Sequence, residues 1–321
     1  MSARWVTLID AATLANLLGA PQLRIIDCRF VLTMAGAGEA AWRQAHVPGA
    51  VYAHLEHDLS GRAGPGLGRH PWPDADAFAA TLSRLGIAPG MQIVAYDDGD
   101  GAFAARLWWL LRNAGYGAVA VLDGGWAAWC AQGLPVETVA SSIVPAPPTA
   151  VAFDASRLLR DADALQRHLD AGGLLIDARA GARFRGETEP LDPRAGHVPG
   201  ARNRPYAENL IDGRFKPAST LAREFDALLA GHGPADVAVM CGSGVTACHH
   251  LLAMAHAGRD GAKLYAPSWS GWVDADGAVA TGAASARFER ARHDTPSVPS
   301  APDARPVPAA RPACRAHSRR R

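Results

Sequence analysis

Cys241 is the side chain of this sequence whose surroundings point most clearly to nucleophilic chemistry. It follows the apolar run 237–240, which is typical of a strand buried on both faces. The loop Cys-Gly-Ser-Gly-Val-Thr, residues 241–246, then leads into good helix formers up to residue 257. The pattern predicts a strand, a loop and a helix. The sulfur would lie at the carboxyl end of the strand, where open α/β sheets bind ligands.

The backbone of this loop is expected to bind an anion. The first N–H groups of a helix have no partner within the helix, and Gly242 and Gly244 allow further N–H groups to turn inward. Such donors form an anion pocket and stabilise a thiolate. The alternative is that Cys241 is a buried structural thiol, because free cysteines often behave as small apolar residues.

Length and composition predict an ordinary two-domain globular protein. The chain has 321 residues, of which 49% are hydrophobic and 20% charged, and its formal net charge is +1. This balance gives no case for binding nucleic acid or a membrane, and no apolar run reaches the roughly 18 to 20 residues that cross a bilayer. Five cysteines without a CxxC pair, and an N-terminus without a signal-peptide core, predict a reducing, cytoplasmic location.

The sequence contains an internal repeat of about 150 residues. The motif at 25–29, Ile-Ile-Asp-Cys-Arg, recurs as Leu-Ile-Asp-Ala-Arg at 175–179, and His-Val-Pro-Gly-Ala at 46–50 recurs at 197–201. Offsets of 150 and 151 residues indicate duplication of a whole domain. In each copy short apolar strands alternate with helical stretches, which predicts an α/β fold with a parallel sheet flanked by helices. The expected helices cover 77–85, 101–114, 158–169, 220–230 and 246–257.

Composition also predicts the domain boundaries. Residues 1–138 would form the first domain, 139–152 a proline-rich linker and 153–284 the second domain. Residues 285–321 hold nine arginines among many prolines and alanines, and this composition predicts a disordered basic tail.

Three flanking motifs, together with the loop and the duplication, resemble the two-domain rhodanese family of sulfurtransferases over roughly residues 5 to 275. These motifs are Ala-Arg-Phe-Arg-Gly at 182–186, Pro-Arg-Ala-Gly-His at 193–197 and Ser-Trp-Ser-Gly-Trp at 268–272. The resemblance implies that only the second domain is catalytic and that Cys241 carries sulfur as a persulfide. The backbone of Gly242, Gly244, Val245 and Thr246 would hold that anion. The first copy has Asp97 after the equivalent strand, which implies a non-catalytic domain that forms one wall of an interdomain cleft.

The loop is similar to that of the family's 3-mercaptopyruvate branch. Thiosulfate-preferring members carry basic residues just after the cysteine, whereas this chain has Gly242 and Ser243, which suit a monocarboxylate thiol. Arg183 matches the family's principal substrate arginine and Arg194 a second one, and guanidinium groups bind carboxylates through two parallel hydrogen bonds. The alternative role for either arginine is a surface ion pair or an interdomain contact. The insertion at 191–192 departs from the family's usual Glu-Pro-Arg spacing.

The same branch implies a proton relay. Its loop serine works with a histidine and an acidic residue of the N-terminal domain, and the matching residues here are Ser243, His70 and Glu56, with Asp58 as an alternative to Glu56. Such a relay would move the proton of the donor thiol while Cys241 attacks.

The sequence therefore predicts transfer of sulfur from 3-mercaptopyruvate through Cys241 to a thiol, thioredoxin or cyanide, releasing pyruvate, with no metal or organic cofactor. A thiosulfate sulfurtransferase with the same nucleophile is one alternative, and a non-catalytic sulfur-binding or interaction module is another. A phosphatase of related fold is disfavoured, because its C-x5-R loop would need arginine where this chain has Ala247.

Overall fold

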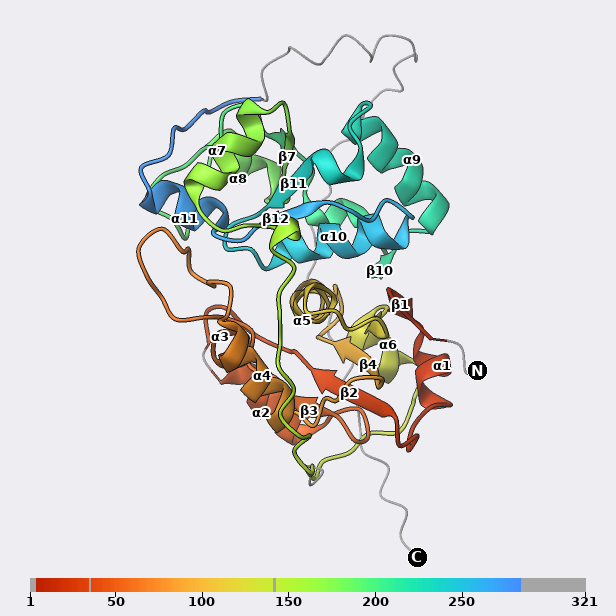
Figure 1. Cartoon of the computed structure of the whole chain (residues 1–321). Helices are drawn as coiled ribbons and strands as arrows, with labels where there is room; N and C mark the ends of the chain where they lie inside the picture. The colour runs from red at the N-terminus through yellow and green to blue at the C-terminus, as the bar shows by residue number, and fades with distance from the viewer. Residues whose placement is uncertain (1–3, 35, 141–142, 284–321) are drawn as a thin grey trace, which may run out of the picture.

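The fold consists of two α/β domains, one N-terminal and one C-terminal, which pack against each other (Figure 1). The computed structural model describes residues 4–34, 36–140 and 143–283. The predicted tail at 285–321 lies outside the described residues. No helix in the described part of the chain is long and apolar enough to cross a membrane.

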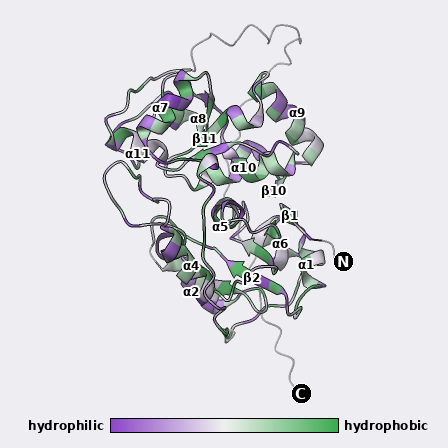
Figure 2. Cartoon of the chain, in the orientation of Figure 1, coloured by the Kyte–Doolittle hydropathy of each residue, from purple (hydrophilic) through white to green (hydrophobic). Residues whose placement is uncertain are grey.

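The N-terminal domain is built on a parallel sheet. Its strands lie in the order β1-β5-β4-β2-β3, with every described pair parallel. Figure 2 shows these strands, largely green, at the centre of the domain. In chain order the strands are β1 (Leu8–Ile9), β2 (Leu23–Asp27), β3 (Val51–Tyr52), β4 (Gln92–Tyr96) and β5 (Val119–Leu122). The helices are α1 (Ala11–Ala15), α2 (Ala37–Gln44), α3 (Leu55–Asp58), α4 (Ala75–Arg84), α5 (Ala102–Asn113) and α6 (Gly125–Ala131).

The C-terminal domain repeats this topology. Its sheet has the order β6-β12-β11-β7-β8, which is the same arrangement strand for strand. The strands are β6 (Leu158–Leu159), β7 (Leu174–Asp177), β8 (Arg202–Asn203), β11 (Val237–Met240) and β12 (Lys263–Tyr265). The helices are α7 (Ala162–Asp170), α8 (Gly181–Arg185), α9 (Ala218–Leu229), α10 (Thr246–His256) and α11 (Ser268–Asp274). The prediction of a duplicated parallel α/β unit is therefore confirmed.

One expected helix boundary is wrong. The helix predicted over 158–169 begins only at Ala162, because the two leucines before it form β6 at the edge of the sheet. Asp161 then caps α7 by accepting a hydrogen bond from the Ala164 N–H. A small antiparallel hairpin, β9 (Leu210–Ile211) with β10 (Arg214–Phe215), and short 3-10 helices at Ala155–Arg157, Tyr206–Asn209 and Pro234–Asp236 complete the described elements.

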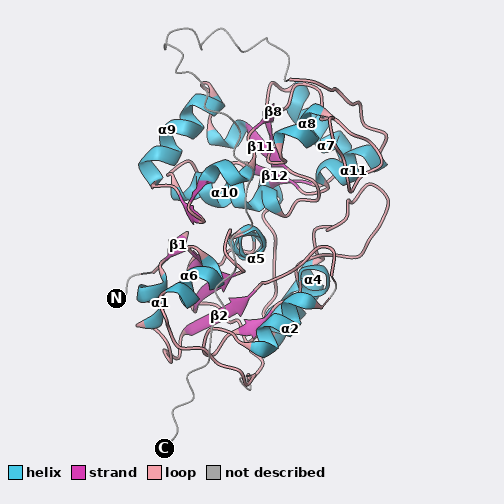
Figure 3. Cartoon of the chain, turned by 180° about the vertical axis from the view of Figure 1, so that it is seen from behind, coloured by secondary structure: helices cyan, strands magenta, loops and turns pink. Residues whose placement is uncertain are grey.

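The interface between the domains is formed largely by α5 and α10. Figures 1 and 3 both show α5 between the N-terminal sheet and the C-terminal domain. Nearly every side chain of α5 is buried, which is typical of a helix enclosed on all sides. The same holds for most of α10. The helix that follows the N-terminal loop therefore packs against the helix that follows the Cys241 loop.

The predicted linker forms no helix or strand among its described residues. It runs along the N-terminal domain, where the Ala146 N–H donates to the Ser83 carbonyl at 2.9 Å and the Ser83 hydroxyl donates back to the Ala146 carbonyl at 2.6 Å. The exact boundaries at 138 and 152 remain predictions.

Candidate active site

Cys241 directly follows β11 and is held firmly by its backbone. The Cys241 N–H donates to the Ser268 hydroxyl at 3.1 Å, and the Cys241 carbonyl accepts from the Trp269 N–H at 2.9 Å. The next carbonyl, of Gly242, accepts from the Ser270 N–H at 2.9 Å. The first turn of α11 thus fixes the start of the loop, and the cysteine is only 2% exposed.

The rest of the loop leaves backbone donors unused. Helix α10 begins at Thr246 without a side-chain cap. In the part of the chain that the structure describes, the N–H groups of Ser243, Val245 and Ala247 donate to no protein acceptor. Unused donors at a helix N-terminus beside a sulfur form a site for an anionic sulfur.

The equivalent loop of the N-terminal domain shows the same geometry with its anion in place. Asp97 occupies the position of Cys241, since its carbonyl accepts from the Trp126 N–H at 2.8 Å as that of Cys241 accepts from Trp269. The Asp97 carboxylate accepts four backbone hydrogen bonds of 2.9–3.2 Å, from Gly99, Gly101, Phe103 and Ala104. Burial and the neighbouring Asp100 raise the pKa of Asp97 to about 7, while these N–H groups oppose the rise. In this copy the backbone donors of the loop are therefore occupied by the carboxyl oxygens of its own side chain.

His70 and Ser243 lie in contact, as the sequence analysis expected of a relay. The His70 imidazole, from the loop before α4, makes a 2.7 Å hydrogen bond through Nδ1 with the Ser243 hydroxyl. His70 is 5% exposed. Burial, together with the positive charges of Arg106 and Arg69, lowers the pKa of His70 to about 4. A neutral imidazole therefore faces the loop at neutral pH and can share a proton with Ser243.

Neither predicted carboxylate lies beside this histidine. Glu56 is exposed in the first turn of α3, and no hydrogen bond joins it to His70 among the described residues. The Asp58 carboxylate accepts from the His54 N–H at 2.7 Å and pairs with Arg84. The structure therefore does not bring Glu56 or Asp58 to the relay, because Asp58 is bound by His54 and Arg84 and Glu56 is exposed on α3.

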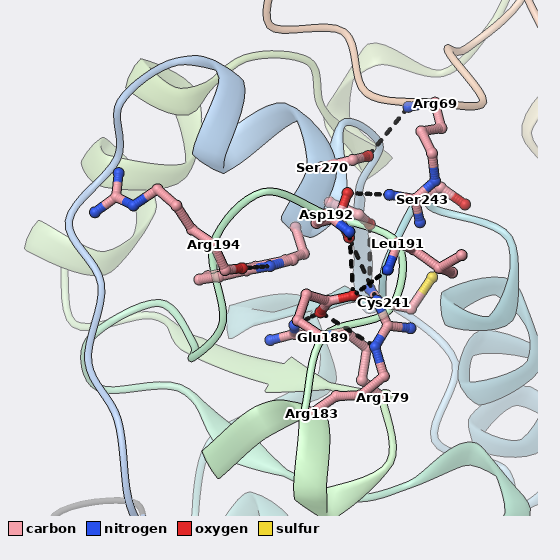
Figure 4. Close-up of polar contacts among 12 residues, drawn as sticks. Arg69, Arg179, Arg183, Glu189, Leu191, Asp192, Arg194, Cys241, Ser243 and Ser270 are labelled. Atoms are coloured by element: carbon pink, nitrogen blue, oxygen red, sulfur yellow. Dashed lines mark hydrogen bonds and ion pairs between the residues drawn. The ribbon is translucent and has the colours of Figure 1, made fainter. Parts of the chain in front are cut away.

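Arg183 lies beside the loop, as predicted. Its guanidinium is within 3.6 Å of the point that a Cβ on Gly242 would occupy. Two hydrogen bonds of 2.6 and 3.2 Å bind it to the Glu189 carboxylate, and a 3.3 Å contact reaches Asp192 (Figure 4). The carboxylates thereby orient the arginine over the cysteine loop.

Arg194, the second predicted substrate arginine, does not reach the site. Its side chain is exposed, points away from Cys241 in Figure 4 and donates to the Gly277 carbonyl at 3.3 Å. The insertion at 191–192 explains the difference, because it places Asp192 next to the loop and moves Arg194 beyond it.

Arg69 takes the place expected of Arg194. Its guanidinium is 3.1 Å from the Cβ position on Gly242, and it forms an ion pair with Asp192. Its backbone N–H donates to the Ser270 hydroxyl at 3.1 Å. Arg69 was not predicted from the sequence, although it directly precedes His70 and enters the cleft with it.

A cavity of about 280 Å³ opens beside Arg69. Residues of both domains line it, including Arg69, Asp192, Ser270 and Asp274. Among the described residues, no group of three or more His, Cys, Asp and Glu side chains is placed to hold a metal ion. Cys241 with its unused loop donors could hold an anionic sulfur, and the guanidiniums of Arg69 and Arg183 beside Gly242 could bind a carboxylate.

Comparison with known proteins agrees with this geometry. The sequence pattern of the rhodanese-like domain matches residues 10–132 and 161–275. A "Probable 3-mercaptopyruvate sulfurtransferase" of Pseudomonas aeruginosa is 48% identical over 280 residues, which cover 86% of this chain and 98% of that relative. A "Putative thiosulfate sulfurtransferase SseB" of Mycobacterium tuberculosis is 41% identical over 85% of this chain and 95% of its own length.

Among solved structures, SseA from Escherichia coli, described as a 3-mercaptopyruvate sulfotransferase, superposes with a TM-score of 0.72 at 32% identity. The match covers 83% of this chain and all of that one. The two-domain arrangement of this chain is thus shared along nearly the full length of its relatives.

Proposed function

The chain belongs to the rhodanese family of sulfurtransferases, and we propose that it moves sulfur from 3-mercaptopyruvate to a nucleophilic acceptor through a persulfide on Cys241. The observation that carries this proposal is the loop around the sulfur. The N-terminal copy fills its donors with the Asp97 carboxylate, whereas the C-terminal copy presents equivalent donors to a cysteine. A persulfide anion on Cys241 would complete the second loop as the carboxylate completes the first.

In the first half-reaction the Cys241 thiolate attacks the sulfur of the donor. A new S–S bond forms, the C–S bond breaks, and its electron pair remains on the carbon of pyruvate enolate. The donor thiol loses its proton to the hydrogen-bonded pair of Ser243 and His70, which can return it to the enolate carbon to give pyruvate. The pair suits this role because its imidazole is neutral at working pH.

In the second half-reaction an acceptor nucleophile attacks the outer sulfur and releases the Cys241 thiolate. A small thiol, thioredoxin or cyanide would each serve, and the scheme predicts ping-pong kinetics. The free N–H groups of the loop stabilise the anionic sulfur in both halves.

Charge balance at the loop favours a monoanionic donor. Arg69 and Arg183 are already faced by the carboxylates of Glu189 and Asp192, so the site carries little excess positive charge. A single carboxylate can share these guanidiniums, whereas dianionic thiosulfate would need more cations beside Gly242. Thiosulfate remains the second candidate donor, because the 41% identical relative is named for it.

The test is a comparison of initial rates with the two donors, using cyanide as the acceptor. We expect mercaptopyruvate to be the better donor, and Cys241→Ser to abolish both the rate and a mass increase of one sulfur atom after incubation with donor alone. Cys248→Ser is the matched control, since this neighbouring thiol is fully buried and bound to the Gly244 carbonyl. A preference for thiosulfate would refute the donor assignment, and a persulfide that survives Cys241→Ser would refute the nucleophile.

We also propose a cytoplasmic location. Among the described residues, Cys28, Cys241 and Cys248 are free thiols. A persulfide carrier needs a reduced cysteine, which a reducing compartment maintains.

A further inference from the structure

Arg106 is a fully buried cation without a partner carboxylate. It projects from α5 of the N-terminal domain, and its exposed fraction is 0%. Within the described residues no Asp or Glu forms an ion pair with it, whereas the buried Arg29 and Arg179 each bind an aspartate two residues away. Burial of a cation without a counter-charge lowers the stability of the folded protein, so the position of Arg106 needs an explanation.

Carbonyl oxygens satisfy the guanidinium instead. Its Nη1 donates to Gly244 at 3.2 Å, and its Nη2 donates to His70 at 3.2 Å and to Pro71 at 3.1 Å. Its Nε donates to Leu59 at 3.2 Å. Gly244 belongs to the cysteine loop and His70 to the relay, so one planar group fixes the two halves of the site relative to each other.

The loop leaves little freedom at this contact. Gly244 has a left-handed backbone with φ of +78°, and the point that its Cβ would occupy is 3.5 Å from the Arg106 Nη1 and 2.5 Å from the Ala266 carbonyl. The Trp72 ring covers the guanidinium with its centroid 5.0 Å away. Movement of Arg106 would therefore move the loop that carries the nucleophile.

The sulfur chemistry proposed for Cys241 would place a negative charge in the loop that Arg106 contacts. Burial lowers the pKa of Arg106, and negative charge on the thiols of Cys248 and Cys241 opposes that effect. Cys248 is a poor source of this charge, since burial raises its pKa to about 12. Cys241 lies in the same loop as the Gly244 carbonyl that Arg106 binds, so its sulfur is the group that the guanidinium can stabilise as thiolate or as persulfide.

We propose that Arg106 is a positioning residue of the neighbouring domain's active site: it fixes the Gly244 and His70 carbonyls and supplies the positive charge that stabilises anionic sulfur on Cys241. This inference rests on the proposed role of Cys241 as nucleophile. The N-terminal domain would then stabilise charge in the site, in addition to forming one wall of the interdomain cleft as the sequence predicts.

The test measures the sulfur anion without any sulfur donor. Alkylation of the full chain by iodoacetamide is followed at the Cys241 peptide by mass spectrometry across a range of pH, in wild type, Arg106→Met and Arg106→Lys. In Arg106→Met we expect the pH of half-maximal alkylation to rise by about one unit, with roughly tenfold slower alkylation at neutral pH. Arg106→Lys keeps the positive charge, so we expect its pH of half-maximal alkylation to lie within about half a pH unit of the wild-type value. Because lysine cannot bind four carbonyls, kcat should still fall roughly tenfold.

Leu107→Ala is the matched control for lost packing. Leu107 is the next residue of α5, is fully buried and has no charge, so its truncation should weaken the protein without moving the alkylation profile. A profile in Arg106→Met that stays with wild type and Leu107→Ala would overturn the electrostatic role. If Arg106→Met does not fold, Arg106→Lys with unchanged kcat overturns the positioning role. If the wild type does not turn over mercaptopyruvate, the donor assignment is refuted instead. The alkylation profiles would then still test whether Arg106 stabilises the Cys241 thiolate.

Discussion

Replacement of Arg69 by methionine should weaken donor binding far more than replacement of Arg194. The Arg69 guanidinium lies over Gly242 next to the nucleophile, whereas that of Arg194 is exposed and directed to Gly277. A charge-assisted hydrogen bond contributes about 1.5–3 kcal/mol, and each 1.4 kcal/mol is tenfold, so Arg69→Met should lower kcat/KM for mercaptopyruvate roughly 10- to 100-fold. The upper end is favoured, because Asp192, with its side chain 3% exposed, would lose a cation and then repel the donor carboxylate.

The assay is steady-state turnover with cyanide, in which KM and kcat are separated. Arg69→Met should act mainly on KM, and Arg183→Met should resemble it. Arg194→Met, the matched control, should stay within about twofold of wild type, because surface contacts of this kind contribute little. If Arg194→Met loses as much as Arg69→Met, the assignment of the second substrate arginine is refuted.

The other predictions concern the relay and the loops. Because the pKa of His70 is about 4, kcat should stay constant from pH 8 to about pH 5 and fall only as the imidazole gains its proton. A decrease of kcat with an apparent pKa near 6.5 in a pH–rate series would contradict this. His70→Asn should lower kcat roughly 100-fold at neutral pH. Asp97→Ala should lower the free energy of unfolding by about 2–4 kcal/mol in urea titrations, because four backbone donors lose their acceptor, whereas Asp98→Ala should change it by less than about 0.5 kcal/mol. Gly244→Ala should reduce turnover at least about tenfold while the far-UV circular dichroism is retained, since a Cβ would lie 2.5 Å from a carbonyl oxygen at a φ of +78°; normal turnover would show that the loop is not constrained in this way.

The duplication and the strand, loop and helix around Cys241 could be predicted from the sequence because both appear as residue patterns along the chain. The repeated Asp-x-Arg motif becomes two equivalent buried ion pairs, and each arginine packs over the tryptophan that fixes its loop, Trp126 or Trp269. The apolar run before Cys241 is a fully buried strand. The edge strand β6 could not be predicted in this way, because two leucines before a helix look the same as its first turn.

The arginines show where such inference fails. The position of Arg183 beside the loop could be predicted because Arg183 lies within a family motif. Arg194 follows an insertion at 191–192, and the course of the backbone through that insertion depends on the fold. Arg69 carries no motif of its own, and its approach to Gly242 depends on how one domain docks on the other. Glu56 was placed by analogy, although its position on a short exposed helix decides where it points.

The two copies differ in their loops, and each contributes different groups to the interdomain site. The N-terminal loop is closed by Asp97, so it cannot carry sulfur, but the elements around it supply Arg69, His70 and Arg106 to the loop of its partner domain. In the proposed mechanism all three serve a nucleophile that their own domain lacks, and His70 and Arg106 contact Ser243 and Gly244 of its loop. A C-terminal domain by itself would keep Cys241 and its free donors but lose the relay, one donor arginine and the buried cation. Catalysis by this chain should therefore require both domains packed together, because the N-terminal domain contributes half of the proposed active site although it has no cysteine of its own in the loop.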